Sequence, residues 1–144
     1  MTTVKTILSE KGSEVVTINP TATLDDAIAT LAQRRIGALV VLGADQRVIG
    51  ILSERDIIRV LGERGAGALK EPLAQTMTRV VVTCGEADAV SAVMEQMTHG
   101  RFRHVPVVEQ DRLIGIISIG DVVKQRLGEM ARESEALRDY IQTA

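Results

Sequence analysis

Residues 49–56, which read I-G-I-L-S-E-R-D, decide the fold because the chain repeats them. Residues 114–121 read I-G-I-I-S-I-G-D, and five of these eight positions are identical in the two copies. Upstream, Val16-Thr17 matches Val82-Thr83 at an offset of 66 residues, and the offset falls to 65 after the first hairpin loop. A tandem repeat of one supersecondary unit predicts two similar surfaces and a site at their junction.

Each repeat predicts the same order of elements, β-α-β-β-α. The first helix has apolar residues at helical spacing, and Thr23 is a plausible N-cap for it in the first repeat. The hairpin strands are almost continuously apolar, as is typical of strands covered on both faces. A second helix begins at Ser53 or Ser118. The expected strands are 15–18, 38–42 and 48–52 in the first repeat and 80–83, 105–108 and 113–117 in the second.

We therefore expect an α/β (α+β) fold of two β-α-β-β-α repeats with pseudo-two-fold symmetry, followed by a C-terminal amphipathic helix. A short helix leads into each repeat, and a glycine-rich linker over 62–68 joins them. The expected boundaries are 1–64 for the first repeat with its lead-in helix, 65–127 for the second repeat with its linker and lead-in helix, and 128–144 for the C-terminal helix.

The C-terminal helix carries an apolar stripe at alternating steps of four and three residues. This spacing is that of a coiled-coil seam of nearly three heptads. The stripe predicts that the helix packs over its own molecule or pairs with a second subunit. Its members are Val123, Leu127, Met130, Ser134, Leu137 and Ile141.

Composition excludes several classes of function. The formal net charge of −2 argues against non-specific nucleic-acid binding, which depends on Lys and Arg. No apolar run approaches the roughly 20 residues of a membrane span, so we expect no membrane partner. Cys84 is the single cysteine, which favours a reducing, cytoplasmic location. Cys84, His99 and His104 lack metal-ligand spacing, so no metal site is expected.

The chemistry concentrates in the two G-h-h-S-x-x-D segments, where h is an apolar residue. One interpretation is structural, because S-x-x-D resembles a capping box that satisfies helix N–H groups. The other interpretation is ligand binding. A helix N-terminus suits a phosphate, and an aspartate one turn into the helix can accept hydrogen bonds from ribose hydroxyls.

The duplicated pattern, with its paired G-h-x-[ST]-x-x-D segments, resembles a tandem CBS domain pair, the Bateman module. The stretch Arg101–Val108 is similar to the basic-basic-x-Pro-Val segment of many such repeats. The likeness spans about residues 4–127, and the chain resembles the stand-alone bacterial members that carry no enzyme or channel domain. It implies a disc with two clefts at the repeat interface that bind AMP, ADP, ATP, NAD(H) or S-adenosylmethionine.

The resemblance also implies roles for individual residues. Asp56 and Asp121 would hold ribose hydroxyls, and Ser53 and Ser118 would contact ribose or phosphate. Thr17 and Thr83 would lie beside the adenine. Arg103 and His104 would point to phosphates, and Arg55 would add a cation that Gly120 cannot supply, so the two clefts should differ. The complete expected nucleotide-binding set is Thr17, Ala38, Leu39, Ser53, Arg55, Asp56, Thr83, Arg103, His104, Val105, Pro106, Ser118 and Asp121.

The predicted function is a regulatory sensor that binds an adenosine nucleotide and transmits its occupancy to a downstream protein partner. AMP, ADP or ATP is expected first and NAD(H) next, and the resemblance implies a homodimer. The alternative is a ligand-independent interaction module that acts through its dimer and C-terminal helix. No catalytic constellation is recognisable, so an enzyme is not expected.

Overall fold

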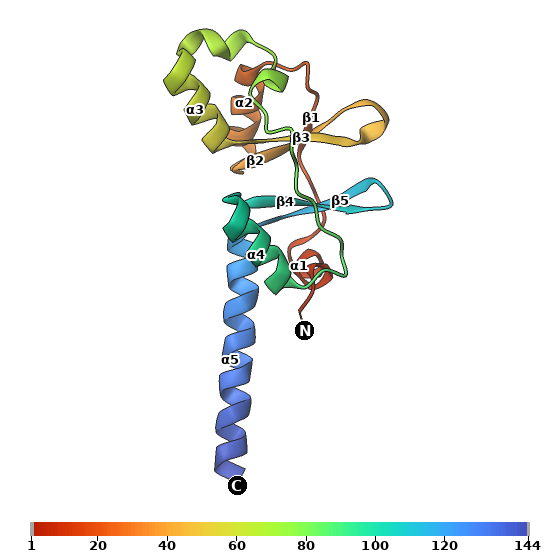
Figure 1. The fold of residues 1–144 in the computed structure, drawn as a ribbon, viewed down its shortest axis with the longest axis vertical. Helices are drawn as coiled ribbons and strands as arrows, with labels where there is room; N and C mark the ends of the chain where they lie inside the picture. The colour runs from red at the N-terminus through yellow and green to blue at the C-terminus, as the bar shows by residue number, and fades with distance from the viewer. Residues whose placement is uncertain (1, 144) are drawn as a thin grey trace. The chain divides into compact units, whose positions relative to one another are not determined.

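Each repeat contains a β-hairpin with one helix before it and one after it (Figure 1). The computed structural model describes residues 2–143. The mixed α/β architecture agrees with the prediction. In chain order the elements are α1 (Val4–Lys11), β1 (Thr17–Ile18), α2 (Leu24–Arg34), β2 (Ala38–Leu42), η1 (Ala44–Gln46), β3 (Val48–Ser53), α3 (Glu54–Arg64), η2 (Ala66–Lys70), η3 (Leu73–Gln75), α4 (Val90–Gly100), β4 (His104–Glu109), β5 (Arg112–Ser118) and α5 (Ile119–Thr143).

The sheet of the first repeat has the strand order β1-β2-β3. Strand β1 runs parallel to β2, with Thr17 opposite Val40, and β2 runs antiparallel to β3, with Ala38 opposite Ser53. The predicted N-cap, Thr23, forms a complete capping box with Asp26 at the start of α2. Both the hairpin and the helix start follow local sequence signals, and both are where the sequence predicts them.

The second repeat departs from the prediction at its first strand. Among the described residues its sheet consists of β4 and β5. In place of the expected strand over 80–83, Cys84 makes a single parallel bridge to Val107. The preceding segment is held elsewhere, because the backbones of Thr78 and Ile51 exchange two hydrogen bonds, of 2.9 and 3.0 Å. Residues near 78 therefore pair with β3 of the first repeat.

The glycine-rich segment over 62–68 is more ordered than a bendable linker. Helix α3 continues through Gly62 and ends at Arg64, and Gly65 then takes a positive φ of 74°. A 3-10 helix follows, in which Ala68 is buried. The expected lead-in helix over 72–77 is a single 3-10 turn, η3.

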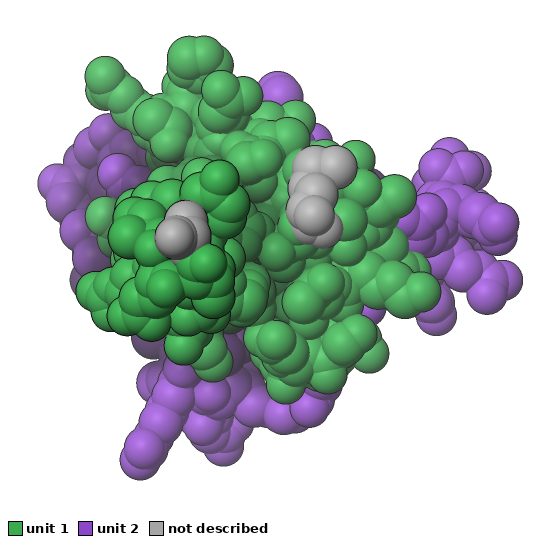
Figure 2. Space-filling model, turned by 90° about the horizontal axis from the view of Figure 1, so that it is seen from below, with its two compact units in different colours: residues 1–13, 83–108, 115–144 green, residues 14–82, 109–114 purple. Residues whose placement is uncertain are grey.

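The chain divides into two compact units that exchange their lead-in segments (Figure 2). We call the first-repeat unit the one formed by Glu14–Val82 with Glu109–Ile114. The second-repeat unit comprises Met1–Ser13, Thr83–Val108 and Gly115–Ala144. The expected boundaries, 1–64 and 65–127, follow the repeats along the chain, whereas α1 belongs to the second-repeat unit.

Backbone hydrogen bonds explain why α1 lies with the second repeat. The N–H of Val4 donates to the carbonyl of Asp88 at 2.9 Å, and the N–H of Lys5 donates to that of Glu86 at 3.0 Å. Val4 and Ile7 are both buried. These contacts satisfy amide groups at the start of α1 that have no partner within a helix.

Helix α5 is continuous from the second motif to the end of the described chain. It begins at Ile119 and ends at Thr143, so the expected segment 128–144 extends a helix that starts nine residues earlier. Val122 and Gln125 are buried within its first turns, and every residue from 131 to 143 is exposed. Figure 1 shows this helix continuing well beyond α4 and α1 of its own unit.

Candidate functional site

The first motif forms a capping box at the junction of β3 and α3. Ser53 is the N-cap, and its Oγ accepts a hydrogen bond from the backbone N–H of Asp56 at 3.2 Å. In return, the Asp56 carboxylate accepts from the Ser53 backbone N–H at 3.0 Å and from its hydroxyl at 3.1 Å. The structural interpretation of S-x-x-D is therefore correct for this segment.

The Asp56 carboxylate has further partners that the sequence analysis missed. The Thr78 hydroxyl donates to Oδ1 at 3.2 Å, and the Arg59 guanidinium donates to the same oxygen at 3.1 Å. Asp56 is 5% exposed. A buried carboxylate requires such partners, because an unpaired charge away from water is costly. Arg59 lies three residues after Asp56, a helical spacing that could have indicated the contact.

The second motif repeats the capping geometry at the start of α5. The backbone N–H of Ser118 donates to Oδ2 of Asp121 at 2.8 Å, and the N–H of Asp121 donates to Oγ of Ser118 at 3.3 Å. The same carboxylate oxygen accepts a hydrogen bond from Lys11, at a distance of 2.7 Å between Nζ and Oδ2. Lys11 also donates to the carbonyl of Ile116 at 2.9 Å.

The electrostatics of Asp121 favour its ionised form. Burial raises the pKa of Asp121, but the hydrogen bonds from Lys11 and Ser118 and the Lys11 charge outweigh burial and hold the pKa below its ordinary value. The Asp121 side chain is 23% exposed. Among the hydrogen bonds formed within residues 2–143, none reaches its Oδ1 atom. Asp121 therefore presents an ionised oxygen that has acceptor capacity left for a ligand hydroxyl.

Each motif aspartate is held by the segment that leads into the other repeat. Thr78, which follows η3, holds Asp56, and Lys11, the last residue of α1, holds Asp121. The lead-in donors of the two motifs therefore differ in charge, because Thr78 offers a neutral hydroxyl and Lys11 an ammonium group. The cation at Asp56 is Arg59, from the helix of the motif itself. From the sequence we expect the motifs to differ through Arg55 and Arg103, and the structure adds Lys11 as a further difference. No local pattern could have indicated Lys11, which is 110 residues from Asp121.

The motif glycines make room for the same exchanged segments. A Cβ atom on Gly50 would lie 2.5 Å from Sδ of Met77 and 3.1 Å from the Thr78 carbonyl oxygen. A Cβ on Gly115 would lie 2.7 Å from Cδ2 of Leu8. In both repeats the glycine therefore permits close approach of a lead-in segment, as expected for a glycine within a strand.

Several expected binding residues lie beside these motifs. Ala38 is opposite Ser53 in the hairpin register, and the N–H of Glu54 donates to the Gly37 carbonyl. In the second repeat the N–H of Ile119 donates to the Arg103 carbonyl at 2.8 Å, which is the matching contact. The structure thus brings the strand starts expected to contact ligand next to both helix starts.

The expected residues differ in how far their side chains are accessible. Thr17 and Thr83 are both exposed; Thr17 is the first residue of β1, and Thr83 lies directly before the Cys84 bridge. Leu39 and Val105 are fully buried, so only their backbone groups are available to a ligand without rearrangement. Pro106 is also buried, and its carbonyl accepts a hydrogen bond from the Cys84 N–H at 3.0 Å.

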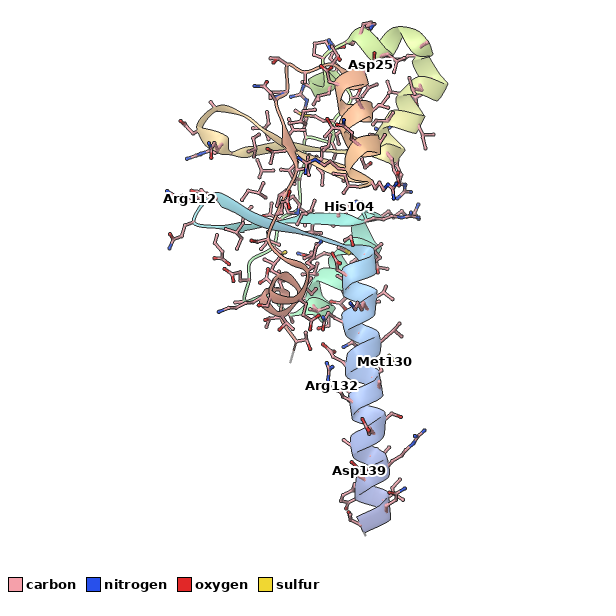
Figure 3. The ribbon with its side chains drawn as sticks, turned by 180° about the vertical axis from the view of Figure 1, so that it is seen from behind. Asp25, His104, Arg112, Met130, Arg132 and Asp139 are labelled. Carbon is pink, nitrogen blue, oxygen red and sulfur yellow. The ribbon has the colours of Figure 1, made fainter. Side chains whose placement is uncertain are left out.

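The expected cationic residues lie at the ends of the motif elements. Arg55 is in the first turn of α3 and is exposed, and Arg103 is exposed directly before β4. His104 is the first residue of β4 and is half-buried (Figure 3). No group of three or more metal-ligating side chains occurs among the described residues. Over the same residues, no helix is both long and apolar enough to cross a bilayer.

Comparison with known proteins assigns the chain to a protein family. The family model of the CBS domain matches the chain twice, at residues 4–63 and 73–128. The chain therefore belongs to the CBS-domain family and carries two copies of the domain. The resemblance expected from the repeated motifs is confirmed.

Solved structures of CBS-domain proteins are similar over most of the chain. The CBS-domain containing protein ATU1752 from Agrobacterium tumefaciens is 48% identical, with a TM-score of 0.83, over 86% of this chain and 92% of that one. The CBS domain protein PAE2072 from Pyrobaculum aerophilum, complexed with AMP, is 29% identical, with a TM-score of 0.75, over 83% and 89%. The CBS domain pair of protein MJ0100, in complex with 5′-methylthioadenosine and S-adenosyl-L-methionine, is 26% identical, with a TM-score of 0.79, over 90% and 98%.

Proposed function

We propose that this protein is a regulatory sensor that binds an adenosine nucleotide at its duplicated motifs. The observation that carries the proposal is the state of Asp121, whose pKa is lowered and whose Oδ1 atom has no hydrogen bond within residues 2–143. An ionised carboxylate at a helix start is the acceptor that ribose hydroxyls require. Relatives with this fold, PAE2072 and MJ0100, carry adenosine-containing ligands in their solved structures.

The proposed contacts follow the motif positions. In the second repeat, Asp121 accepts from the ribose, and Ser118, Arg103 and His104 contact ribose or phosphate. Thr83 lies beside the adenine, and the backbones of Val105 and Pro106 line it. In the first repeat the matching residues are Thr17, Ala38, Leu39, Ser53, Arg55 and Asp56.

We expect the second motif to bind more strongly than the first. Asp56 already accepts hydrogen bonds from Ser53, Thr78 and Arg59, and it is nearly buried. A ribose would have to displace one of these donors, which costs part of the binding free energy. Oδ1 of Asp121 has no such donor among residues 2–143, and Lys11 adds a positive charge beside the carboxylate.

The charge of the neighbouring residues favours a phosphorylated ligand. Arg103 and Lys11 suit the phosphate of AMP, ADP or ATP, which we rank first, or the pyrophosphate of NAD(H), which we rank second. S-adenosylmethionine carries a sulfonium cation in place of phosphate and gains nothing from these cations. We propose that bound ligand acts by differential affinity for two states of the protein, and that no catalytic step is involved. A cytoplasmic location remains a prediction from the sequence.

Calorimetric titration of nucleotide-stripped protein with AMP, ATP, NADH and S-adenosylmethionine tests the proposal. We expect saturable heats for AMP or a relative and at least tenfold weaker binding by Asp121→Asn, because an amide replaces the charged acceptor. Asp139→Asn is the matched control, since Asp139 is an exposed carboxylate far along α5. If Asp121→Asn leaves AMP affinity unchanged, the ribose assignment is wrong for this motif.

A second candidate function is an interaction module, and the exposed apolar stripe of α5 favours it. In this alternative the motifs serve only as helix caps and the protein acts through a homodimer. Absence of heat with all four compounds, together with concentration-dependent dimerisation, would support this candidate over the sensor.

A further inference from the structure

An apolar stripe runs along α5 and stays largely uncovered by the described part of the chain, residues 2–143. Leu127, Met130, Leu137 and Ile141 are each more than half exposed, and Val123 is 39% exposed. Scattered exposed apolar residues are normal, but a continuous row on one helix face indicates a contact surface. We call the row the α5 stripe, and it comprises Val123, Leu127, Met130, Ser134, Leu137 and Ile141.

Helix α5 is attached to its own unit by a different face. Val122 is fully buried, and the Gln125 side chain, 8% exposed, donates to the carboxylate of Glu10 in α1 at 2.5 Å. At 100° per residue, Gln125 points away from the direction shared by Val123 and Leu127. The attachment therefore leaves the stripe accessible from its first residue.

The outer part of the helix has the same two-sided character. Met130 belongs to the stripe and Arg132 lies on the opposite side of the helix, as Figure 3 shows. Asp139, further along, shares the polar side with Arg132, because the two residues are seven positions apart. The polar side can stay in contact with water, whereas the apolar α5 stripe would be stabilised by burial against a partner.

The spacing of the stripe is that of a coiled coil. Its steps of four and three residues give a period of 3.5, with Leu127, Ser134 and Ile141 at a positions and Val123, Met130 and Leu137 at d positions. In the flanking positions, Arg126 and Glu133 occupy g, and Lys124 and Arg138 occupy e. Arg126 already forms an ion pair with Glu129 of its own helix. These flanking charges determine which orientation of two helices is favourable.

We propose that the α5 stripe pairs with the α5 stripe of a second copy of this chain as a parallel, two-stranded coiled coil. In the parallel arrangement, Glu133 of each copy lies opposite Arg138 of the other copy, which gives two attractive pairs. In the antiparallel arrangement that overlaps all six stripe residues, Glu133 faces Glu133 and Lys124 faces Arg138, so both contacts are repulsive, and Arg126 faces the uncharged Tyr140. The charge pattern thus selects both the occupant and its orientation.

The two charges are available for this pairing. Glu133 and Arg138 are exposed, and neither takes part in an ion pair with another residue between 2 and 143. They are five residues apart, which is unfavourable for a contact within one helix but matches the g-to-e contact between two helices. The pattern is therefore explained by a partner helix and not by stabilisation of a single helix.

The folded unit assists the pairing. A stripe shorter than three heptads is marginal for isolated helices, since helix nucleation is costly. Here the first turns of α5 are already fixed by Val122, Gln125 and the Ser118–Asp121 cap. The outer turns extend a helix that already exists, so association does not include the cost of nucleation.

Sedimentation velocity of the full chain over a range of concentrations tests the proposal. Leu137→Asp should raise the dimer dissociation constant at least tenfold, and it should not unfold the chain because Leu137 is 59% exposed. Arg138→Glu should weaken the parallel dimer, and Glu133→Lys combined with Arg138→Glu should restore it. Asp139→Asn, on the polar side, should change nothing.

The same variants identify a wrong orientation. In an antiparallel pair, Arg138→Glu would place a carboxylate opposite Lys124 and strengthen the dimer. Oxidation of Ser134→Cys should give a covalent dimer, because equivalent a positions face each other only in the parallel form, whereas Asp139→Cys should not cross-link. A chain that stays monomeric, or a dimer unaffected by Leu137→Asp, would overturn the proposal.

This inference deepens the homodimer of the second candidate function and does not depend on nucleotide binding. Calorimetry on Leu137→Asp separates the two. Loss of the dimer in Leu137→Asp with unchanged nucleotide heats supports the coiled coil and shows that the sensor does not depend on it. Loss of the dimer in Leu137→Asp, when neither this variant nor the unmodified protein gives nucleotide heats, supports the coiled coil and rejects the sensor.

Discussion

At the level of single residues, Asp56 and Asp121 perform the same capping task with different additional partners. Asp56 is nearly buried and takes donors from Ser53, Thr78 and Arg59. Asp121 is more accessible and takes its additional donor from Lys11. The difference has consequences for stability and for pH dependence.

Removal of the two carboxylates should cost different amounts of stability. Asp56→Ala removes a nearly buried acceptor that serves Ser53, Thr78 and Arg59, and we expect a loss of about 2 kcal/mol in the free energy of unfolding. Asp121→Ala removes an accessible cap and should cost about 1 kcal/mol. Equilibrium urea unfolding measures both. Equal losses would show that the burial of Asp56 contributes nothing.

Lys11 should control the protonation of Asp121. Lys11→Met removes both the hydrogen bond and the positive charge, so the pKa of Asp121 should rise toward or above its ordinary value. Titration of the carboxyl carbon by NMR measures the change. Lys5→Met, an exposed lysine on the same helix, should leave this titration unchanged.

The sign of the pH effect on stability follows from the lowered pKa. The folded state holds the Asp121 proton less tightly than the unfolded chain does, so the contribution of Asp121 is complete above the unfolded value. It disappears as pH falls from the ordinary value of 3.8 through the lower folded pKa. In Lys11→Met this acid-dependent loss should be smaller, and an unchanged loss would contradict the assignment.

At the level of elements, the glycine of each Ile-Gly-Ile strand accommodates a lead-in segment. Gly50→Ala would place its Cβ against Met77, which is buried and lies beside the Thr78 carbonyl. We expect a destabilisation of about 2 kcal/mol by overpacking. In a double-mutant cycle with Met77→Ala the two costs should be less than additive, because the truncated side chain makes room.

Gly62→Ala is the control for this substitution. A Cβ on Gly62 meets no atom within 4 Å, and the residue lies inside α3. Alanine should therefore stabilise the helix by about 1 kcal/mol. If unfolding measurements showed that Gly50→Ala also stabilises the protein, the close approach of Met77 to Gly50 would be unimportant for stability.

At the level of the whole molecule, each lead-in segment contributes to the stability of the unit that it packs into. That unit is not the one formed by the repeat that follows the segment in the chain. Ile7→Ala, near the N-terminus, should destabilise the second-repeat unit, and Leu31→Ala should destabilise the first-repeat unit. Each truncation of a buried side chain should cost about 3 kcal/mol. Hydrogen exchange read by mass spectrometry distinguishes the units.

The expected pattern is specific to the exchange. In Ile7→Ala, protection should fall in α4 and the first turns of α5 and remain in α2 and β2. In Leu31→Ala the pattern should reverse. If Ile7→Ala instead lowered protection in α2 and β2, α1 would belong with the first repeat, as its position in the chain suggests.

The sequence by itself determined the features that depend on residues close together in the chain. The Thr23–Asp26 and Ser53–Asp56 caps need partners three residues apart, and the hairpins follow from apolar strands with short loops between them. The duplication, and with it membership of the CBS family, can be recognised from the amino-acid sequence without the structure. Local hydrogen bonding and periodicity are sufficient for these predictions.

Only the tertiary structure decided which segment completes each motif. The contact of Lys11 with Asp121 spans 110 residues, and that of Thr78 with Asp56 spans 22. It also decided that 80–83 forms no strand, because the adjoining Thr78 pairs with β3. Such contacts depend on which surfaces are buried against each other in three dimensions, and no periodicity along one chain encodes that choice.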